Sequence, residues 1–271
     1  MLTKRVYGCI PTSLVNREKF RVFRGVSELS LPEDLDMRPL QPPVVDQGQL
    51  GSCTGNGIAE ELEAQALAQN EKLTMRSRLF IYYNERVMEG TVNQDSGAQI
   101  ADGITCVQNQ GVCSETEWPY DISKFKVKPP VNCYTDASQF KTLTAQCINQ
   151  NLNDLKAALV YGESVEGLFP QFAPNGIVIG ISVYDSFESD VVASSGDVPM
   201  PNIETETLQG GHCVRLVGYT DNGLADIPPQ SFIGMNSWGT SWGKKGFFSI
   251  PYSYITNPNL SSDQWVVTAV S

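Results

Sequence analysis

Basic residues are scarce in this chain of 271 residues, which carries 19 Lys and Arg against 30 Asp and Glu and has a net charge of −11. A protein that binds nucleic acid neutralises phosphates with clusters of Lys and Arg, so this composition argues against such a partner. Long apolar runs are also missing. The longest apolar run with β-branched residues, at residues 176–183, is far shorter than the roughly 20 residues that span a bilayer. The sequence therefore predicts neither a nucleic-acid partner nor a membrane-spanning helix.

The cysteines and the histidine do not form a metal-binding pattern. There are 7 cysteines but only 1 histidine, and no two cysteines have the C-x-x-C spacing, which argues against a structural zinc site. Most of the cysteines are expected to be reduced and buried as small apolar residues. A disulfide such as Cys113 to Cys133 is an alternative that the sequence leaves open, as it does the pairing of the remaining candidates Cys9, Cys106, Cys147 and Cys213.

The first 34 residues have no sustained apolar period. They start with basic residues, but Pro11 and polar residues interrupt the apolar core that a secretory signal would need. We expect residues 1–34 to form an arm wrapped on the body of the protein, or a short pro-segment.

The two halves of the remaining sequence differ in apolar periodicity. In the first half, apolar residues recur every three or four positions, which predicts helices over residues 54–70, 77–89 and 98–110, the last closed by Gly111. After Leu155, β-branched and aromatic runs alternate with turn residues, which predicts strands over residues 176–184, 212–220, 231–238, 246–252 and 264–270. The sequence thus predicts an α+β fold, mainly helical over about 45–150 and mainly an antiparallel sheet or barrel over about 151–271.

Cys53 lies between a glycine-rich loop and the first predicted helix. The stretch DQGQLGSCTGNGIAEEL, residues 46–62, lacks the G-x-x-x-x-G-K-[ST] pattern of a phosphate-binding loop. A helix N-terminus carries about half a positive charge, which favours a thiolate and predicts a pKa of Cys53 below the usual value of about 8.5. The alternative is an inert, buried cysteine, the commoner fate of a single thiol. Thr54-Gly55-Asn56-Gly57 is a weak first turn for a helix, and the sequence does not explain it.

A thiol nucleophile needs a base, and His212 is the one histidine of the chain. Gly210 and Gly211 precede it at the start of an apolar run, which places its imidazole at a strand end beside a loop. A lone histidine is more often a core residue than a catalyst, so its position alone favours neither interpretation. Asn236 is an amide that can hold the second ring nitrogen, and Trp238 can shield that hydrogen bond from water.

In combination these motifs resemble those of the papain-like cysteine proteases, the family of papain and the cathepsins. Residues 47–53, QGQLGSC, are similar to the family's Q-G-x-C-G-S-C, and Gly211-His212 resembles its base strand. Residues 236–246 match its N-S-W-G-x-x-W-G-x-x-G signature. The D-x-G-A at residues 95–98 and the G-V…E…W-P-Y at residues 111–120 resemble elements of its shorter, signal-less branch. The resemblance runs from about Leu31 to the C-terminus.

The resemblance implies a cysteine endopeptidase with a two-lobed fold: a helical left lobe, an antiparallel β-barrel-like right lobe, and the active-site cleft between them. It implies Cys53 as nucleophile, His212 as general acid/base and Asn236 as the residue that orients the imidazole. Gln47 would donate its side-chain amide to the oxyanion, and the backbone N–H of Cys53 would be the second donor.

For the substrate, the resemblance implies a peptide or protein bound along the cleft. Gly97, Ala98, Gly211 and Trp238 are the residues expected to contact it. The implied reaction requires no metal and no cofactor.

Two departures from the family pattern concern a disulfide. Leu50 replaces the first cysteine of the family's C-G-S-C, and Asp95 stands where the usual partner cysteine would be. That bridge is therefore absent. Together with the lack of a visible secretory signal, its absence favours the cytoplasm or another reducing compartment.

The resemblance also divides the chain into residues 1–34, an arm or short pro-segment, and residues 35–271, the catalytic domain. The arm is shorter than the family's usual inhibitory propeptide. It is either a permanent strap, which we favour, or a segment that lies in or beside the cleft and inhibits the enzyme.

Two further expectations follow. Eight acidic residues and no Lys or Arg lie between Lys156 and Arg215. Because the part at residues 186–209 should border the cleft, it predicts a preference for Lys or Arg near the scissile bond.

The alternative to an active enzyme is a catalytically silent relative that binds a peptide or a partner. A Cys-His transglutaminase or cell-wall amidase would not share the N-S-W-G-x-x-W-G run.

Overall fold

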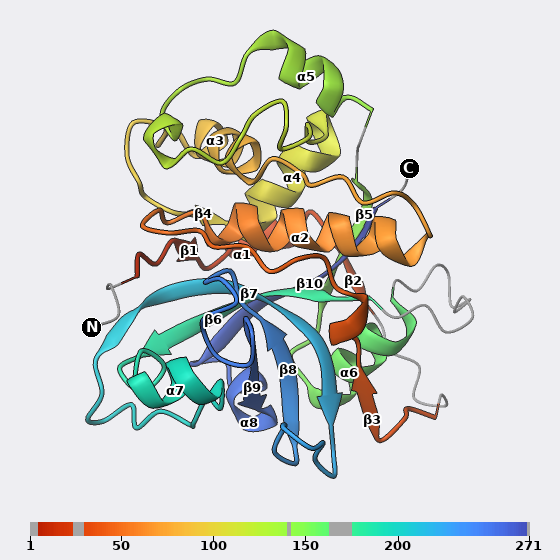
Figure 1. Cartoon of the computed structure of the whole chain (residues 1–271), viewed down its shortest axis with the longest axis vertical. Helices are drawn as coiled ribbons and strands as arrows, with labels where there is room; N and C mark the ends of the chain where they lie inside the picture. Colours follow the sequence, from red (N-terminus) through yellow and green to blue (C-terminus); the bar gives the residue numbers. More distant parts are fainter. Residues whose placement is uncertain (1–4, 24–29, 140–141, 163–174, 270–271) are drawn as a thin grey trace.

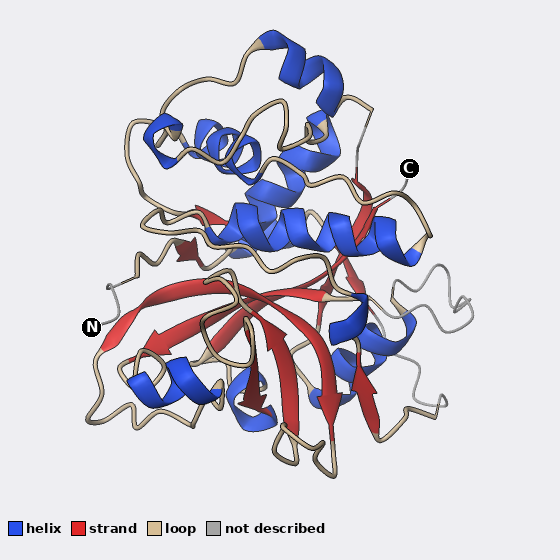
Figure 2. Ribbon diagram, viewed as in Figure 1, coloured by secondary structure: helices blue, strands red, loops and turns tan. Residues whose placement is uncertain are grey.

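The computed structural model describes residues 5–23, 30–139, 142–162 and 175–269. It is an α+β fold with two lobes, one mainly of helices and one built on a sheet (Figures 1 and 2). The helical lobe, uppermost in Figure 1, contains α2 (Cys53–Ala68), α3 (Arg78–Glu89), α4 (Ile100–Gln110) and α5 (Val131–Ala137). The α2 helix runs along the boundary between the lobes and packs on the sheet below it. No helix in the described ranges is long and apolar enough to cross a membrane.

The sheet of the second lobe has the strand order β2-β5-β10-β6-β7-β8-β9, and β3 also pairs with β7. These strands are β2 (Arg21–Phe23), β3 (Asp34–Asp36), β5 (Thr142–Ile148), β6 (Ile177–Tyr184), β7 (Leu208–Thr220), β8 (Ser231–Met235), β9 (Phe247–Pro251) and β10 (Ser261–Ala269). The predicted two-lobed α+β fold is confirmed. Among the described residues the barrel-like sheet is open, because β2 and β9 lie at opposite edges and do not pair. The β2–β5 pair is also parallel, whereas the other pairs of this sheet are antiparallel.

The three predicted helices and five predicted strands are confirmed, with shifted ends. The predicted helix at 54–70 is α2, and the one at 98–110 is α4, which Gly111 ends with a positive φ of 77°. The prediction missed β5, which lies in the stretch expected to be mainly helical. It also missed the short elements α1 (Leu14–Arg17), α6 (Leu152–Tyr161), α7 (Asp190–Ser195), α8 (Tyr252–Ile255), β1 (Cys9–Ile10), β4 (Ala98–Gln99), η1 (Arg38–Leu40) and η2 (Ile122–Lys124).

Close packing of backbones explains the weak first turn of α2. A Cβ on Gly55 would lie 2.7 Å from the carbonyl oxygen of Arg78 at the start of α3. A Cβ on Gly57 would lie 3.0 Å from the sulfur of Cys213 on β7. Both glycines therefore let neighbouring elements approach the beginning of α2 more closely than any side chain would allow.

The α2 helix also buries several acidic groups. The carboxylate of Glu61 receives the Nε–H of Arg215 at 2.9 Å, and both side chains are completely buried. Glu63 forms no such ion pair within the part of the chain that the structure describes, and its Oε1 accepts the backbone N–H of Arg76 at 2.7 Å. Its Oε2 has no hydrogen-bond partner among the described residues. Burial raises the pKa of Glu63 from its ordinary value of 4.5 to about 8.

The raised pKa of Glu63 makes the stability of the fold depend on pH. The folded chain holds this proton more tightly than the unfolded chain does. The free energy of unfolding therefore falls as the pH rises from about 4.5 to about 8, by up to about 1.4 kcal/mol per pH unit. Glu63→Gln keeps the oxygen that accepts the Arg76 N–H and removes the charge. We expect its stability in urea, relative to wild type, to rise with pH across this window.

The matched control is Glu204→Gln, which removes an exposed carboxylate. A stability difference between Glu63→Gln and wild type that is the same at pH 5 and pH 8 would contradict the prediction.

Candidate active site

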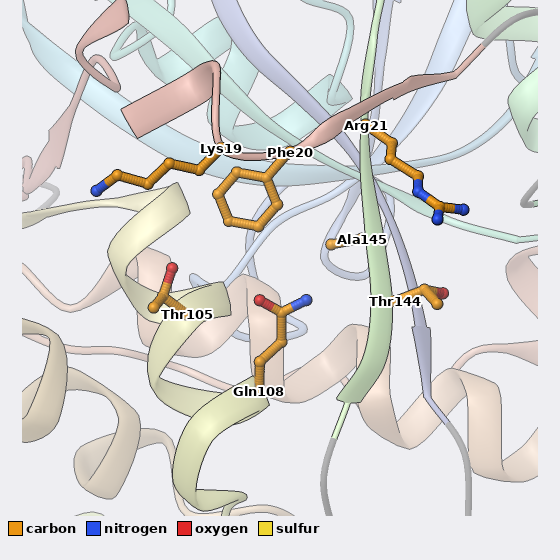
Figure 3. Close-up of a pocket in the computed structure, with 7 residues that line it drawn as sticks. All are labelled: Lys19, Phe20, Arg21, Thr105, Gln108, Thr144 and Ala145. Atoms are coloured by element: carbon orange, nitrogen blue, oxygen red, sulfur yellow. The ribbon is translucent and has the colours of Figure 1, made fainter. Parts of the chain in front are cut away.

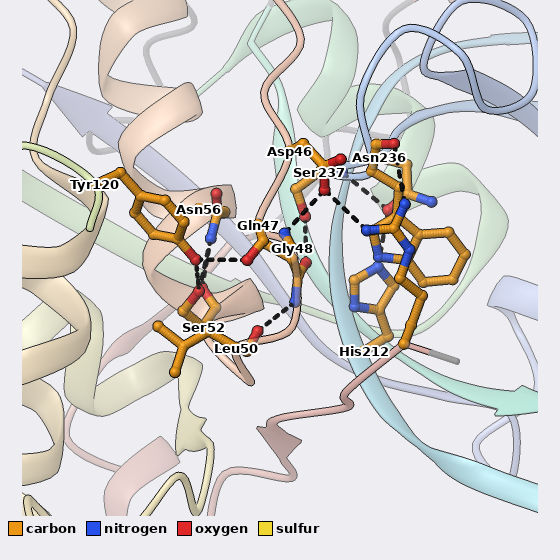
Figure 4. A network of polar contacts seen from close by, with 12 residues as sticks. Asp46, Gln47, Gly48, Leu50, Ser52, Asn56, Tyr120, His212, Asn236 and Ser237 are labelled. Atoms are coloured by element: carbon orange, nitrogen blue, oxygen red, sulfur yellow. Dashed lines mark hydrogen bonds and ion pairs between the residues drawn. The ribbon is translucent and has the colours of Figure 1, made fainter. Parts of the chain in front are cut away.

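Cys53 is the first residue of α2 and is completely buried. The loop before it is held by Gln47, whose side chain is also buried. The Gln47 amide nitrogen Nε2 donates to the carbonyl oxygen of Leu50 at 3.0 Å, and its Oε1 accepts the Ser237 hydroxyl at 2.6 Å (Figure 4). These two contacts fix the orientation of the Gln47 amide beside the N-terminus of α2.

His212 lies on β7, and its imidazole is completely buried. Its Nε2 lies 2.8 Å from the Oδ1 of Asn236. Figure 4 shows this contact. Its Nδ1 has no hydrogen-bond partner among the described residues. The ring of Trp238 stacks on the imidazole, with centroids 5.0 Å apart and planes 25° apart. One ring nitrogen of the base is therefore held and shielded, and the other is unpaired.

Backbone contacts join these predicted residues into one site. The backbone N–H of Cys213, the residue after His212, hydrogen-bonds to the sulfur of Cys53. Gln47 and Asn236 are connected through Ser237. The Ser237 carbonyl accepts the backbone N–H of Gln47 at 2.9 Å, and the Ser237 N–H donates to the Asn236 Oδ1 at 2.9 Å. The structure thus brings together Cys53, His212, Asn236 and Gln47 from α2, β7 and the loops beside them.

A second layer of polar residues supports the Cys53 loop, and the sequence analysis did not assign it. Tyr120 donates its hydroxyl proton to the carbonyl of Gln47 at 2.9 Å, and its oxygen lies 2.5 Å from the Ser52 hydroxyl. Asn56 donates to the carbonyl of Ser52 at 2.8 Å. The guanidinium of Arg78 donates to Asn56 at 3.0 Å and lies 4.0 Å from the centroid of the Tyr120 ring. The sequence feature that could have indicated this layer is the W-P-Y motif at residues 118–120, because it contains Tyr120.

Hydrogen bonds to Asp95 occupy the place of the missing disulfide. The Asp95 carboxylate accepts the backbone N–H of Gly51 at 3.1 Å from each oxygen and also receives the Tyr82 hydroxyl. Leu50 is buried in the same core cluster as Cys53. All 7 cysteines are free and buried, so the Cys113–Cys133 disulfide that the sequence left open does not form here.

The N-terminal arm runs over the site. Strand β1 pairs in parallel with β4, and the carbonyl of Gly8 accepts the N–H of Ala98 at 2.7 Å. A Cβ on Gly97 would lie 2.1 Å from the Gly8 oxygen, and one on Gly211 would lie 2.1 Å from the Cys9 oxygen. Gly97, Ala98 and Gly211, which were predicted to contact substrate, thus contact the backbone of the arm.

The arm is also held by three acidic side chains, and each bonds to a different group of it. The contacts are Arg5 Nη1 to Asp46 Oδ1 at 2.8 Å, Tyr7 Oη to Glu188 Oε1 at 2.6 Å and Thr12 N to Asp263 Oδ2 at 2.7 Å.

Burial sets the protonation of Cys53 and His212. It raises the pKa of Cys53 to about 11, although N–H groups of Cys213 and Gly8 at the sulfur oppose the rise. Burial likewise lowers the pKa of His212 to about 4, against the hydrogen bond that the imidazole donates to the Asn236 Oδ1. The prediction of a lowered Cys53 pKa is therefore wrong for the covered site, since loss of water outweighs the helix N-terminus. Thiol and imidazole are both neutral at neutral pH.

The described acids of the segment before His212 form bonds both within the segment and outside it. Glu206 accepts the backbone N–H groups of Ser186 and Asn202, each at 2.8 Å. Asp197 pairs with Lys244 at 2.8 Å. Of the eight acids counted there, Glu188 bonds to the arm, and Glu163 and Glu166 lie outside the described residues.

A surface pocket of about 440 Å³ lies apart from these residues, between the arm, α4 and β5. Figure 3 shows Lys19 and Arg21 pointing away from each other at its two sides, with Phe20, Thr105 and Gln108 between them. The predicted site residues do not line it.

Known proteins resemble this chain in sequence and in structure. Residues 31–266 match the sequence model of the papain family cysteine proteases. A peptidase C1-like protein of Acanthamoeba polyphaga mimivirus, described as uncharacterized, is 40% identical over 236 residues, which cover 84% of this chain and 70% of that protein. Procathepsin L of Mus musculus is 25% identical over 235 residues, but the match covers only 64% of its length.

The crystal structure of xylellain, a cysteine protease from Xylella fastidiosa, superposes with a TM-score of 0.83 at 35% sequence identity and covers 100% of both chains. The procathepsin B of Trypanosoma congolense shares the fold with a TM-score of 0.74 at 16% identity, over 98% of this chain and 87% of that one. From the family match and these relatives, we conclude that the chain belongs to the papain family of cysteine proteases.

Proposed function

We propose that the chain is a cysteine endopeptidase that its own arm keeps latent. Cys53 is the nucleophile, His212 the general acid/base, and Asn236 orients the imidazole. The observation that carries the proposal is the state of His212: Nε2 is held at 2.8 Å by Asn236, while the buried Nδ1 is unpaired within the described part of the chain. A binding protein without catalysis would have no need for an imidazole held in this way.

The reaction begins when the arm leaves and water enters. Burial is the largest cause of both pKa shifts, so hydration lowers the pKa of Cys53 and raises that of His212. The thiol proton then moves to Nδ1, and the thiolate attacks the peptide carbonyl carbon. His212 gives this proton to the leaving amine as the C–N bond breaks. Water, deprotonated by the same imidazole, hydrolyses the thioester and regenerates the thiol.

The oxyanion that forms during the attack needs hydrogen-bond donors. One N–H of the Gln47 amide is used by the Leu50 carbonyl at 3.0 Å, which leaves the second for the substrate oxygen. The backbone N–H of Cys53 is the other proposed donor. Because Ser237 holds the Gln47 Oε1 at 2.6 Å, the amide cannot rotate to present its oxygen instead. Removing one such donor typically lowers kcat by about 10² to 10³.

The arm meets the nucleophile through its backbone. The N–H of Gly8 lies at the Cys53 sulfur, where it opposes the rise of the thiol pKa. In this proposal the arm excludes substrate and water from the thiol.

Two parts of residues 1–34 have different roles in this proposal. Residues 5–12 cover the cleft and inhibit. Further along, β2 is part of the sheet and its Phe23 is completely buried, so this part acts as a permanent strap. Latency is then reversible, because residues 5–12 can leave while β2 stays paired. We retain residues 35–271 as the proposed catalytic domain, with lobes at about 45–150 and 151–271.

Gly8→Ala should activate the intact chain. A Cβ at Gly8 would lie 1.8 Å from the carbonyl oxygen of Gly51, and neither backbone has room to yield. The arm must therefore lift from the cleft. We expect a rise of about tenfold or more in the initial rate of hydrolysis of a fluorogenic peptide, which corresponds to the cost of overpacking.

The matched control is Leu14→Ala, an arm residue whose side chain is 77% exposed, and its rate should equal that of wild type. Sequencing should find the same N-terminus before and after the assay. Activation that appears only after loss of the first residues would contradict a reversible arm.

An epoxide inhibitor of papain-like enzymes tests the roles of the site residues in the Gly8→Ala chain. It should label Cys53 once and leave Cys53→Ala unlabelled. Asn236→Ala should lower kcat by about ten- to hundredfold with an unchanged circular dichroism spectrum, since it loses only the orientation of the imidazole. Equal activity of the Asn236→Ala and parent chains would argue for a different orienting group.

The pH dependence of alkylation reports the covering of the thiol. Only the thiolate reacts, so the rate at Cys53, followed by peptide mapping with iodoacetamide, should rise with pH toward a midpoint of about 11 in the wild type. In Gly8→Ala the midpoint should fall, because hydration removes the main cause of the raised pKa. Identical midpoints in the two chains would show that the arm does not control the thiol.

A further inference from the structure

We propose that Asp46 and Trp238 form a subsite for a Lys or Arg side chain of the substrate, on the leaving-group side of the scissile bond. This inference rests on the proposed peptidase function. The substrate class is a peptide with Lys or Arg after the scissile bond, and the acid that would select it is Asp46, which lies outside the acidic segment at residues 186–209.

The subsite is occupied by a guanidinium of the arm. Arg5 Nη1 lies 2.8 Å from Asp46 Oδ1, and Arg5 Nη2 donates to the backbone carbonyl of Trp238 at 3.4 Å. The guanidinium carbon lies 5.4 Å from the centroid of the Trp238 ring, within the range of a cation–π contact. A carboxylate, a carbonyl and an aromatic ring thus converge on one cation, which leaves only 19% of the Arg5 side chain exposed.

The subsite is rigid without the arm, because the catalytic body fixes each of its walls. The backbones of Asp46 and Trp238 pair as an antiparallel bridge, and the N–H of Gly239 donates to the carbonyl of Val45 at 2.9 Å. The Asp46 carboxylate accepts the N–H of Gly48 at 2.8 Å, which holds its rotamer. When residues 5–12 leave, this carboxylate stays in place and loses its cation.

The position of Trp238 indicates on which side of the scissile bond the substrate cation would lie. Its ring stacks on His212, the group that donates a proton to the leaving amine in the proposed mechanism. Substrate residues after the scissile bond must therefore pass on the His212 and Trp238 side of Cys53. In the arm, Gly8 lies at the sulfur and Arg5 three residues away. The cation should accordingly come from one of the first three substrate residues after the scissile bond.

Other acids at the cleft are less suited to bind a cation. Glu188 accepts an uncharged hydroxyl from Tyr7, and Asp263 accepts the backbone N–H of Thr12 and the Ser262 hydroxyl. Asp46 is the acid of the three that holds a charged group of the arm. This ion pair is the observation from which we infer that a cation binds at that position.

The test is a competition between peptides in the Gly8→Ala chain. Pairs of peptides differ only by Lys or Gln at the first, second or third position after the scissile bond. Both members are mixed in one tube at low ionic strength, so the ratio of their kcat/KM values does not depend on how much enzyme is open. At one of these positions we expect Lys to be preferred by about three- to tenfold, the effect of a partly exposed ion pair with a cation–π contact.

Asp46→Asn in the same background should bring the ratio close to 1, since the amide oxygen keeps the Gly48 hydrogen bond but the charge is gone. Glu204→Gln, which removes an exposed acid elsewhere, should leave the ratio unchanged. Raising the ionic strength to about 0.5 M, roughly three times the physiological level, should also lower the ratio.

Equal cleavage of the Lys and Gln peptides at all three positions would overturn the subsite and leave the peptidase intact. A preference for Lys that survives Asp46→Asn would assign it to another acid and would also overturn the proposal. If the Gly8→Ala chain cleaves no peptide and resists the epoxide at Cys53, the proposed function itself fails, and the subsite fails with it.

Discussion

Burial is the constraint on which the chemical state of the site depends. It shifts the pKa values of Cys53 and His212 in opposite directions, each toward the neutral form. A neutral pair has no thiolate to attack with. In the proposed latency, inhibition by the arm would therefore be electrostatic as well as steric. The close approach of the arm depends on residues at which any Cβ would collide, namely Gly8, Gly97 and Gly211.

Two glycines near the start of α2 lower the intrinsic stability of this helix but allow the close packing on which the site depends. Glycine costs about 1 kcal/mol in a helix interior relative to alanine, and α2 has it at residues 55 and 57. The gain is close contact of its first turn with α3 and β7, which brings Cys53 beside the backbone of Cys213. The loop before α2 is then stabilised from outside by Tyr120 and Arg78, through hydrogen bonds to Gln47 and Asn56.

Sequence predicted the long elements and the residues of the candidate site, but not the contacts that depend on distant parts of the chain. Periodicity located α2 to α4 and β6 to β10, since each buries one continuous face. It missed β1 and β2, because two or three residues carry no period and form strands only by pairing with β4 and β5. Motifs identified Cys53 and His212. Their pKa values could not be predicted, because burial by Gly8 arises from a segment about 45 residues away, and no local pattern reports it.

If the arm keeps the enzyme latent as proposed, latency and specificity are linked, because the arm and a substrate would use the same groups. The apparent affinity for substrate would then be proportional to the fraction of molecules in which the cleft is open. Under this proposal a change at Asp46 has two effects: it weakens the contact with Arg5, which opens the cleft, and it weakens the contact with a substrate cation. The two effects oppose each other in the absolute rate but not in the ratio between two substrates, since the open fraction is common to both. The absolute rate of hydrolysis by the intact chain thus depends mainly on how often the arm leaves the cleft. The ratio of the rates for two substrates depends on how the open cleft binds each of them.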